Sequence, residues 1–570
     1  MTDTRETDTP RTARAGAAGR RALGALAGLL AAAAGLAVGE PVSAAVRREA
    51  APVTAVGDAV IELAPAGVTR WSIDTFGDSD KLVLEAGVVA LLGLFAAALG
   101  VLAARDRRAG AAGALLFGLV GVTAAVTRPD GGPSDAWPSV AAGLAAAVVL
   151  TLLARRLPAA AGTGAAPDSA SAGGLRPADA AATAEAARPA GTPDPGPAAD
   201  AGQAPGTGPR RAFLVSAGAV AAGSGGAWLL GRRLHDGEAA RAAGARASLT
   251  LPAPDDPAGA LPAGTDLGVD GVGPFLTPND RFYRIDTALR VPRLDARAWR
   301  LRIHGAGVPR PLTIGYARLL ERELVERDIT LACVSNPVGG TLVGNARWLG
   351  VRLEELLREA GVRPPSAGGE ADQLVARSAD GMTLGTPVEA VMDGRDALLA
   401  VGMNGEPLPF EHGYPVRMVV PGLYGYVSAC KWLVDLELTS FDAFDAYWVR
   451  RGWARQAPVK TQSRIDTPRS GARLRAGRVP VAGVAWAQHT GIDAVQVRVD
   501  EGPWRNARLA EEDTADTWRQ WVWDWDAEPG GHRLQVRAVD RSGETQTADV
   551  SGSAPDGATG RHTVTVEVTD

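Results

Sequence analysis

The sequence predicts a multidomain chain with an N-terminal α-helical membrane bundle, a central α+β domain and a C-terminal Ig-like β-sandwich. Three observations lead to this prediction. A length of 570 residues is enough for about three or four domains. Apolar stretches of transmembrane length fill the first part of the chain, and short strands separated by turn residues fill the last part.

The membrane bundle is expected within residues 1–156. Its four apolar stretches are rich in Ala, Gly, Leu and Val, and polar connectors separate them. These stretches are 22–39, 82–104, 110–127 and 137–154. One such stretch could be a buried helix of a soluble protein, but four in succession indicate four transmembrane helices.

Arginines set the expected orientation of these helices. They precede the first stretch at Arg20, lie between the second and third at Arg107, and follow the fourth at Arg155. These places share one side if all four helices span, and the positive-inside rule makes that side cytoplasmic. Residues 157–209, a Pro/Ala/Gly/Asp tract with few large apolar residues, are expected to be a disordered cytoplasmic linker.

Residues 210–232 begin with two arginines, one spacer and Phe213-Leu214, and continue into a mildly apolar run. This arrangement is similar to a twin-arginine export signal followed by a fifth transmembrane helix. The alternative is that Arg210 and Arg211 are ordinary positive-inside residues before that helix. Both interpretations place the rest of the chain outside the cytoplasm, in a multi-pass protein of the cell membrane.

Two domains are expected after the membrane segments, at 252–457 and 458–570. In the first, Trp299–Ile303 alternates as a strand and Leu353–Ala360 has helical spacing. In the second, short strands with turns between them indicate a sandwich of about 110 residues. The expected strands are Val479–Trp486, Ala494–Val499, Gln520–Trp525, Arg533–Val539 and Thr563–Val568.

Composition excludes several classes of protein. The net charge of -5 argues against a nucleic-acid binder. With Cys333 and Cys430 as the only cysteines, a disulfide framework, a four-cysteine iron–sulfur cluster and an all-cysteine zinc site are excluded. All six histidines lie at or after His235, which excludes a bis-histidine haem between the four predicted membrane helices.

A series of short segments carries the chemistry of the central domain. Cys333 follows an apolar run in Thr-Leu-Ala-Cys-Val-Ser-Asn, and Gly-Asn-Ala-Arg-Trp-Leu-Gly-Val comes eleven residues later. Met-Asn-Gly-Glu-Pro-Leu-Pro begins at Met403, His-Gly-Tyr-Pro-Val-Arg ends at Arg417, and Lys431 is one of three lysines in the chain. In this order and spacing the segments resemble the sulfite oxidase family of molybdenum-cofactor enzymes, over about residues 252–570. The resemblance implies a sulfite-oxidase-type molybdopterin domain and a dimerisation-type sandwich.

The resemblance implies that Cys333 is the protein ligand of molybdenum, beside the dithiolene of a molybdopterin cofactor. A soft thiolate suits such a metal. The alternatives are a buried inert cysteine or a disulfide to Cys430. By the same resemblance, the cofactor-binding set is Asn279, Phe282, Tyr283, Cys333, His412, Arg417, Ser428 and Lys431. Asp380 is a candidate catalytic residue, and the alternative is a turn aspartate before Gly381.

Departures from the family pattern concern the residues that hold sulfite. Apolar or acidic residues replace expected arginine or tyrosine side chains at four places: Ile285, Val338, Val401 and the Ile492 or Asp493 site. Arg347 and Arg377 are the arginines that could substitute for them. Burying a dianion without cationic partners is costly, so the substrate is expected to be neutral or less anionic than sulfite.

The expected function is therefore two-electron oxygen-atom transfer at molybdenum, in a membrane-anchored enzyme whose catalytic domain lies outside the cytoplasm. Expected partners are a small-molecule substrate, an external electron-transfer partner and the membrane, but no nucleic acid, and the sandwich is a candidate homodimer contact. Two kinds of alternative remain. The first is sulfoxide reduction or true sulfite oxidation on the same cofactor. The second is a cofactor-free, membrane-anchored binding protein.

Overall fold

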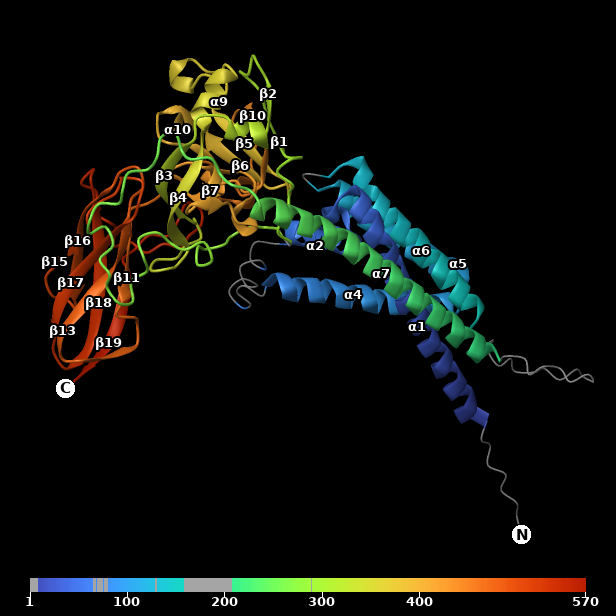
Figure 1. Cartoon of the computed structure of the whole chain (residues 1–570). Helices are drawn as coiled ribbons and strands as arrows, with labels where there is room; N and C mark the ends of the chain where they lie inside the picture. Colours follow the sequence, from blue (N-terminus) through green and yellow to red (C-terminus); the bar gives the residue numbers. More distant parts are fainter. Residues whose placement is uncertain are drawn as a thin grey trace, which may run out of the picture. The chain divides into compact units, whose positions relative to one another are not determined.

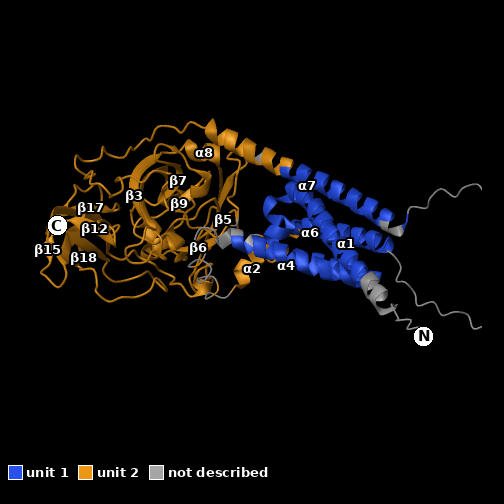
Figure 2. Cartoon of the chain, turned by 90° about the horizontal axis from the view of Figure 1, so that it is seen from below, with its two compact units in different colours: residues 1–56, 82–125, 134–232 blue, residues 57–81, 126–133, 233–570 orange. Residues whose placement is uncertain are grey.

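The computed structural model describes residues 9–64, 68, 75, 80–128, 131–157, 208–288 and 290–570. The chain divides into two compact units (Figures 1 and 2). Unit 1 comprises residues 1–56, 82–125 and 134–232, and unit 2 comprises 57–81, 126–133 and 233–570. The linker expected at 157–209 falls almost wholly outside the described residues.

Six helices are described in the N-terminal part of the chain, within the residues that the structure covers. They are α1 (Thr9–Val46), α2 (Pro52–Leu63), α4 (Asp80–Ala103), α5 (Arg107–Val126), α6 (Ala136–Arg155) and α7 (Pro209–Ala247). Among the described residues, five segments are long and apolar enough to cross a membrane, in α1, α4, α5, α6 and α7. The predicted apolar helices are thus confirmed. The fifth continues well beyond Gly231, through charged residues to Ala247.

Small residues bring the helices of unit 1 close together. A Cβ atom on Gly28 of α1 would lie 1.9 Å from the carbonyl oxygen of Ala96 in α4. In α5 and α6, a Cβ atom on Gly118 would lie 2.9 Å from the Cα atom of Gly143. Backbones that approach this closely tolerate only glycine at the contact, as is common where apolar helices pack against each other.

Two sheets form the central region of unit 2. The first has the order β2-β1-β10-β5-β6, with β1 parallel to β10. Its strands are β1 (Arg300–Gly305), β2 (Leu312–Gly315), β5 (Gln373–Ser378), β6 (Thr383–Pro387) and β10 (Leu433–Thr439). The predicted strand at Trp299–Ile303 corresponds to β1, where Leu301 and Ile303 are fully buried.

The second sheet has the order β3-β4-β7-β8, and β9 also pairs with β7. Its strands are β3 (Val325–Ala332), β4 (Val343–Arg352), β7 (Leu398–Met403), β8 (Glu406–Pro407) and β9 (Arg417–Val419). Short helices connect the strands of the two sheets: α8 (Tyr316–Leu320), α9 (Leu353–Glu359), α10 (Val388–Met392) and α11 (Gly425–Ser428). The predicted helix at Leu353–Ala360 corresponds to α9 within one residue.

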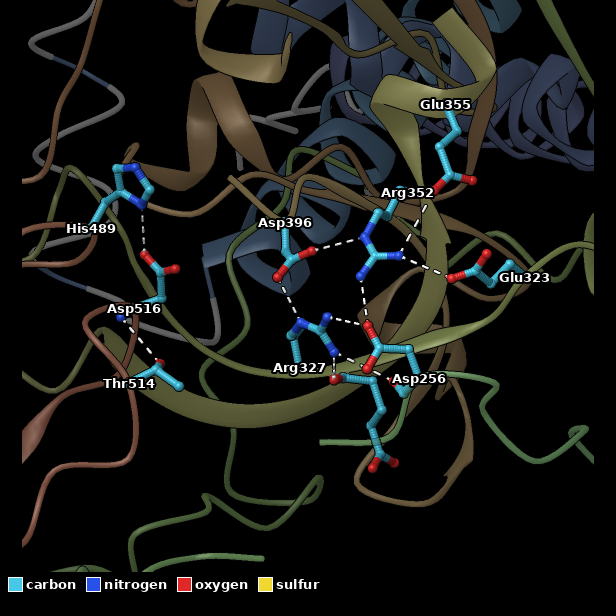
Figure 3. Close-up of polar contacts among 10 residues, drawn as sticks. Asp256, Glu323, Arg327, Arg352, Glu355, Asp396, His489, Thr514 and Asp516 are labelled. Atoms are coloured by element: carbon cyan, nitrogen blue, oxygen red, sulfur yellow. Dashed lines mark hydrogen bonds and ion pairs between the residues drawn. The ribbon is translucent and has the colours of Figure 1, made fainter. Parts of the chain in front are cut away.

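An ion-pair network fixes the edge of the second sheet (Figure 3). Arg327 of β3 and Arg352 of β4 both contact Asp256 and Asp396, at 2.5–3.1 Å. The segment around Asp256 is thereby tied to two neighbouring strands. Each guanidinium contacts both aspartates, and each aspartate contacts both guanidiniums, so the charges are mutually compensated.

The C-terminal region is rich in β-structure, and two sheets share one core. One sheet has the order β11-β13-β17-β16 and the other β12-β19-β18-β14-β15. The first contains β11 (Gln462–Thr467), β13 (Gly477–Trp486), β16 (Arg508–Leu509) and β17 (Arg519–Ala527). The second contains β12 (Ala472–Arg475), β14 (Ile492–Val499), β15 (Arg505–Asn506), β18 (Gly530–Asp540) and β19 (Thr563–Thr569). All five predicted strands are confirmed, and four shorter ones were not predicted.

The two sheets bury apolar side chains from both sides. Val481 and Trp521 come from the first sheet, and Val497, Val536 and Val566 come from the second. From Leu534 to the end of β18, every second residue is buried, which is the pattern of a strand with one face in a core and one outside.

Candidate cofactor site

Cys333 is the first residue after β3, at the start of the loop that leads to β4. Its N–H group donates to the carbonyl of Leu342 at 2.9 Å, which closes the loop on itself. The Sγ atom lies 2.9 Å from the hydroxyl oxygen of Ser335. Cys333 and Cys430 are both free thiols in the structure, so the disulfide alternative is not supported. Burial raises the pKa of the Cys333 thiol, and the Ser335 contact offsets part of this shift.

Aromatic rings lie beside this cysteine. Phe282 stacks on Tyr283 with ring centroids 5.2 Å apart, and it meets Trp348 of β4 edge to face at 5.9 Å. The Tyr283 hydroxyl and the carbonyl oxygen of Ala332, the residue before Cys333, both lie close to Gly425. Burial, and then the nearby Cys333 thiolate, raise the pKa of Tyr283, so its phenol is protonated at neutral pH.

Arg417 is a buried cation behind these rings. Its guanidinium stacks on Trp348 at 4.9 Å, and Nη1 donates to the carbonyl of His412 at 3.1 Å. The Nε atom is buried and has no hydrogen-bond acceptor within the described part of the chain. Burial lowers the pKa of Arg417 to about 10, which leaves it charged at pH 7. A buried guanidinium with an unused donor fits a site that accepts an anionic group.

His412 and Asn279 line a cavity of about 700 Å³, together with Phe282. Nε2 of His412 lies 3.0 Å from the carbonyl oxygen of Asn279. Because a carbonyl can only accept, Nε2 carries the proton and Nδ1 is left as an acceptor. Burial, and then the charge of Arg417, lower the pKa of His412 to about 4, so the ring is neutral at physiological pH. The Asn279 amide is held by Glu406 and Asn404, at 2.6 and 2.8 Å.

Lys431 does not present a free positive charge. Its Nζ atom donates to the Asp286 carboxylate at 2.8 Å and to the carbonyl of Glu411 at 3.1 Å. The two charged side chains are only 11% and 4% exposed, so they form a buried ion pair. Arg284 also donates to Asp286, at 2.7 Å. Burial lowers the pKa of Lys431 to about 8, and Asp286 opposes this shift.

Asp380 and Ser428 are placed differently. Oδ1 of Asp380 accepts the N–H of Met382 at 3.2 Å, and Gly381 has a φ of +87°, as expected for a turn aspartate before glycine. Asp380 also lies within the electrostatic field of Asp286 and Lys431, and burial raises its pKa. The hydroxyl of Ser428 donates to carbonyls of its own segment, at 3.0 and 3.1 Å, so this donor is already used.

The arginines that could replace the lost sulfite contacts are occupied elsewhere. Arg347 binds the Asp328 carboxylate with two donors, at 2.6 and 2.9 Å. Arg377 contacts Glu437 at 2.5 Å and Asp435 at 3.6 Å. Both guanidiniums are therefore neutralised by carboxylates on neighbouring strands.

The four substituted positions carry no positively charged side chain. Val401 is completely buried inside β7, and Ile492 is 1% exposed in the C-terminal core. Val338 is half-buried in the loop after Cys333, and Ile285 is exposed. None of these positions supplies a cation.

The C-terminal region contributes two residues that sequence analysis did not single out. Arg464 of β11 donates to the carbonyl of Gly340 at 2.8 Å, in the loop that follows Cys333. His562 packs so closely on Gly339 that a Cβ atom there would lie 2.1 Å from the imidazole ring. No local pattern marks these residues, because the contacts join positions more than 100 residues apart. Arg246, near the end of α7, also lines the cavity and donates to the carbonyl of Leu408 at 2.7 Å.

Comparison with known proteins places this geometry in a family. Residues 288–448 match the model of the oxidoreductase molybdopterin binding domain. Sulfite oxidase of Gallus gallus is 32% identical over 322 residues, which cover 49% of this chain and 69% of that protein. The chain belongs to the sulfite oxidase family. It is a molybdenum-cofactor-dependent oxidoreductase, and molybdopterin is its cofactor.

Other known proteins are similar to this chain over different lengths. Mitochondrial sulfite oxidase of Mus musculus is 30% identical, and the alignment covers 49% of this chain and 58% of that enzyme. The chain thus spans between about half and two thirds of the length of these relatives. The uncharacterized oxidoreductase YuiH of Bacillus subtilis is 31% identical over 159 residues, 28% of this chain and 74% of that protein. The crystal structure of the sulfane dehydrogenase SoxCD from Paracoccus pantotrophus is 28% identical, with a TM-score of 0.44, covering 52% of this chain and 82% of that one.

The residues present fit the cofactor of the sulfite oxidase family. The Cys333 thiol offers a soft ligand at a loop whose backbone is fixed. The buried, unused Nε donor of Arg417 suits the phosphate of the cofactor, and the neutral imidazole of His412 suits its polar ring system. The glycine at 413 has a φ of +108°, and a Cβ atom there would lie 3.0 Å from Lys431, so only glycine leaves this corner open.

Proposed function

We propose that this chain is a membrane-anchored, extracytoplasmic molybdopterin oxidoreductase that transfers an oxygen atom to or from a small substrate less anionic than sulfite. The observation that carries the proposal is that three candidate cations are already paired with carboxylates. Lys431 is paired with Asp286, and neither Arg347 nor Arg377 is free to hold an anion. With Arg417 assigned to the phosphate of the cofactor, a dianionic substrate would lose its hydration without gaining an unpaired cation from these side chains.

The site residues bind the metal, hold the cofactor or supply a proton. Cys333 binds molybdenum, and the bound cofactor supplies the two-electron centre for oxygen-atom transfer. Arg417 holds the cofactor's phosphate, while Asn279, Phe282 and His412 shape the cavity around its ring system. Tyr283 presents a protonated phenol beside Cys333 and so acts as a hydrogen-bond donor there. Asp380 remains a candidate proton carrier because burial raises its pKa and so favours the neutral carboxyl group.

The membrane topology is part of the same proposal. Five helices are suitable membrane spans, and the arginines near them favour a cytoplasmic N-terminus. The pair Arg210-Arg211 at the start of α7 suits export of a domain already folded around its cofactor. The proposed domains are 1–156, 157–209, 210–232, 252–457 and 458–570, the last being an Ig-like sandwich.

Metal analysis of the full chain tests the proposal most directly. We expect about one molybdenum per chain from a host that makes the cofactor and is supplied with molybdate. Metal-free protein from such a host would favour the cofactor-free binding protein instead. Steady-state assays with artificial electron donors and acceptors, comparing sulfite with neutral sulfoxides, then decide the substrate class and the direction of electron flow.

A reporter fused after Asp570 tests the topology. We expect an external signal in the wild type and a cytoplasmic signal when Arg210 and Arg211 are both replaced by lysine. An unchanged external signal in the double variant would make the pair an ordinary topology signal. A cytoplasmic signal from the wild type would overturn the proposed orientation.

A further inference from the structure

A second cluster of cations lies in the C-terminal region, on the sheet that contains β14 and β18. Three guanidiniums surround the indole of Trp504: Arg537 at 4.3 Å from the ring centroid, Arg498 at 4.8 Å and Arg561 at 5.2 Å. We call these four residues the Trp504 patch. An indole has two faces, so at least two of the three guanidiniums share a face and lie side by side.

The strands explain why these side chains gather outside the core. Val497, Leu534 and Val536 point into the shared core of the two sheets. Because side chains alternate along a strand, Arg498 and Arg537 point to the opposite face of the same sheet. Both arginines lie opposite a glutamine in the β14–β18 register, Arg498 opposite Gln535 and Gln496 opposite Arg537.

Neutral acceptors hold each guanidinium in place. Nε of Arg498 donates to the side chain of Gln535 at 3.1 Å, and Nε of Arg537 donates to Gln496 at 2.8 Å. Nε of Arg561 donates to the backbone carbonyl of Gln546 at 3.3 Å. These hydrogen bonds fix the orientation of the three guanidinium groups without neutralising their charge.

Carboxylates compensate the patch only weakly. Glu501 is the acid that pairs with a patch arginine, and its oxygen lies 3.9 Å from Nη1 of Arg498. That carboxylate is 79% exposed and also pairs with Arg533. Burial, and then the charges of neighbouring patch arginines, lower the pKa of Arg537 and Arg561. The guanidiniums therefore repel one another, and a bound anion would relieve this repulsion.

We propose that the Trp504 patch is a docking site for a protein partner that presents a cluster of aspartate or glutamate side chains. Arginine and tryptophan are the residue types that most often dominate binding energy in protein interfaces. Here they are already ordered by stacking and by hydrogen bonds, so little conformational entropy is lost on binding. Opposite charge on the partner speeds association and sets the orientation.

The patch does not suit a second copy of this chain. In a two-fold symmetric dimer, a patch at the centre of the interface faces its own copy. Three uncompensated guanidiniums would then meet three others, which is unfavourable. If the chain forms a homodimer through its C-terminal region, we expect another surface to be used.

Binding of a fluorescein-labelled peptide of ten glutamates to the full chain in uncharged detergent micelles tests this proposal. Fluorescence anisotropy at low salt should show binding that weakens as salt is raised, and a peptide of ten glutamines should not bind. Arg498→Gln with Arg537→Gln should weaken binding by about tenfold or more. Trp504→Ala should weaken it too, because the guanidiniums lose their common support.

The matched control is the double variant Arg473→Gln with Arg475→Gln. These arginines are exposed on β12 of the same sheet but are not part of the patch. We expect less than a twofold change in this control. An equal loss of peptide affinity in both double variants would overturn the proposal, because binding would then depend only on the net charge of the chain.

Two further results would also overturn it. Sulfate that displaces the peptide at matched ionic strength, at concentrations where chloride does not, would make the patch a small-anion site. A dimer that dissociates in the Arg498/Arg537 variant, seen by analytical ultracentrifugation, would make it a contact between copies.

Discussion

Basic side chains are arranged in opposite ways among the candidate cofactor-site residues and around Trp504. Among the site residues, Lys431 meets Asp286 in a pair that is almost completely buried. Around Trp504, three guanidiniums share one weak and exposed carboxylate contact. The difference follows from burial: an unpaired charge is costly inside a protein, whereas at a surface water can solvate it. The first region should therefore discriminate against anions, and the second should attract them.

The largest expected effect is at the metal ligand itself. Cys333→Ser should lower kcat/KM by at least about 10³-fold, equivalent to about 4 kcal/mol, because a hard hydroxyl replaces the soft thiolate. Molybdenum content and steady-state rates measure this effect. Cys430→Ala is the control, since Cys430 is the other buried free thiol and is not the proposed ligand. A Cys333→Ser enzyme with full activity would show that the ligand has been assigned to the wrong residue.

The second prediction concerns sulfite. Each lost charge-assisted contact is worth about 1.5–3 kcal/mol. If two or more of these contacts to sulfite are absent, kcat/KM for sulfite should be about 10²- to 10⁴-fold lower than in an enzyme that has them. Asp286→Asn should raise kcat/KM for sulfite by about tenfold, because Lys431 loses its carboxylate partner. Asp295→Asn, at an exposed pair with Arg297, is the control. Near-diffusion-limited sulfite turnover by the wild type would show that the pocket does hold a dianion.

Sequence patterns predicted the features that depend on neighbouring residues, but not the contacts between distant parts of the chain. Alternation along β1 and β18 is local, so it can be recognised without the fold. Cys333 and Arg417 lie in short segments whose order alone indicates the family. The pairing of Lys431 with Asp286 joins residues 145 positions apart, and no local pattern reveals it. The acid at 286, next to the substituted position Ile285, was the available signal.

The glycines of the N-terminal helices illustrate the same limit. Composition predicted apolar helices, but not that Gly28 of α1 would meet the backbone of α4. Such contacts depend on which helix faces cross, and this is a property of the packed unit. The Trp504 patch is a similar case, since its arginines come from two strands and a loop before a third.

The third prediction concerns the stability of the buried pair. Lys431→Ala removes one cationic partner from the buried Asp286 carboxylate, and breaking a buried pair in this way costs up to about 3–5 kcal/mol. We expect a lower Tm for the metal-free chain by differential scanning fluorimetry. The double variant Asp286→Asn with Lys431→Ala should recover part of the loss, because no uncompensated carboxylate remains. Equal Tm values for the single variant and the wild type would mean that water solvates Asp286.

The smallest expected effect is a pH dependence of stability. It arises where a loop of the C-terminal region meets β3 of the central region. Asp513, in the loop between β16 and β17, has a half-buried carboxyl group. Its Oδ2 atom has no hydrogen-bond donor among the described residues. Burial, and then the carboxylate of Asp328 in β3, raise the pKa of Asp513 to about 6. Since the folded value lies above the usual 3.8, this group favours the folded state at low pH, and the contribution is lost as pH rises through 6.

The Tm of the wild type should therefore fall between about pH 4 and pH 6 by more than that of Asp513→Asn, whose amide does not titrate. Asp526→Asn, at an exposed acid of β17, should follow the wild type. Arg347 limits the size of the effect, because it neutralises Asp328 through two hydrogen bonds. Identical pH profiles for Asp513→Asn and the wild type would mean that Arg347 already compensates both acids. The contact between the central and C-terminal regions would then follow the same rule of paired charges as the cofactor pocket.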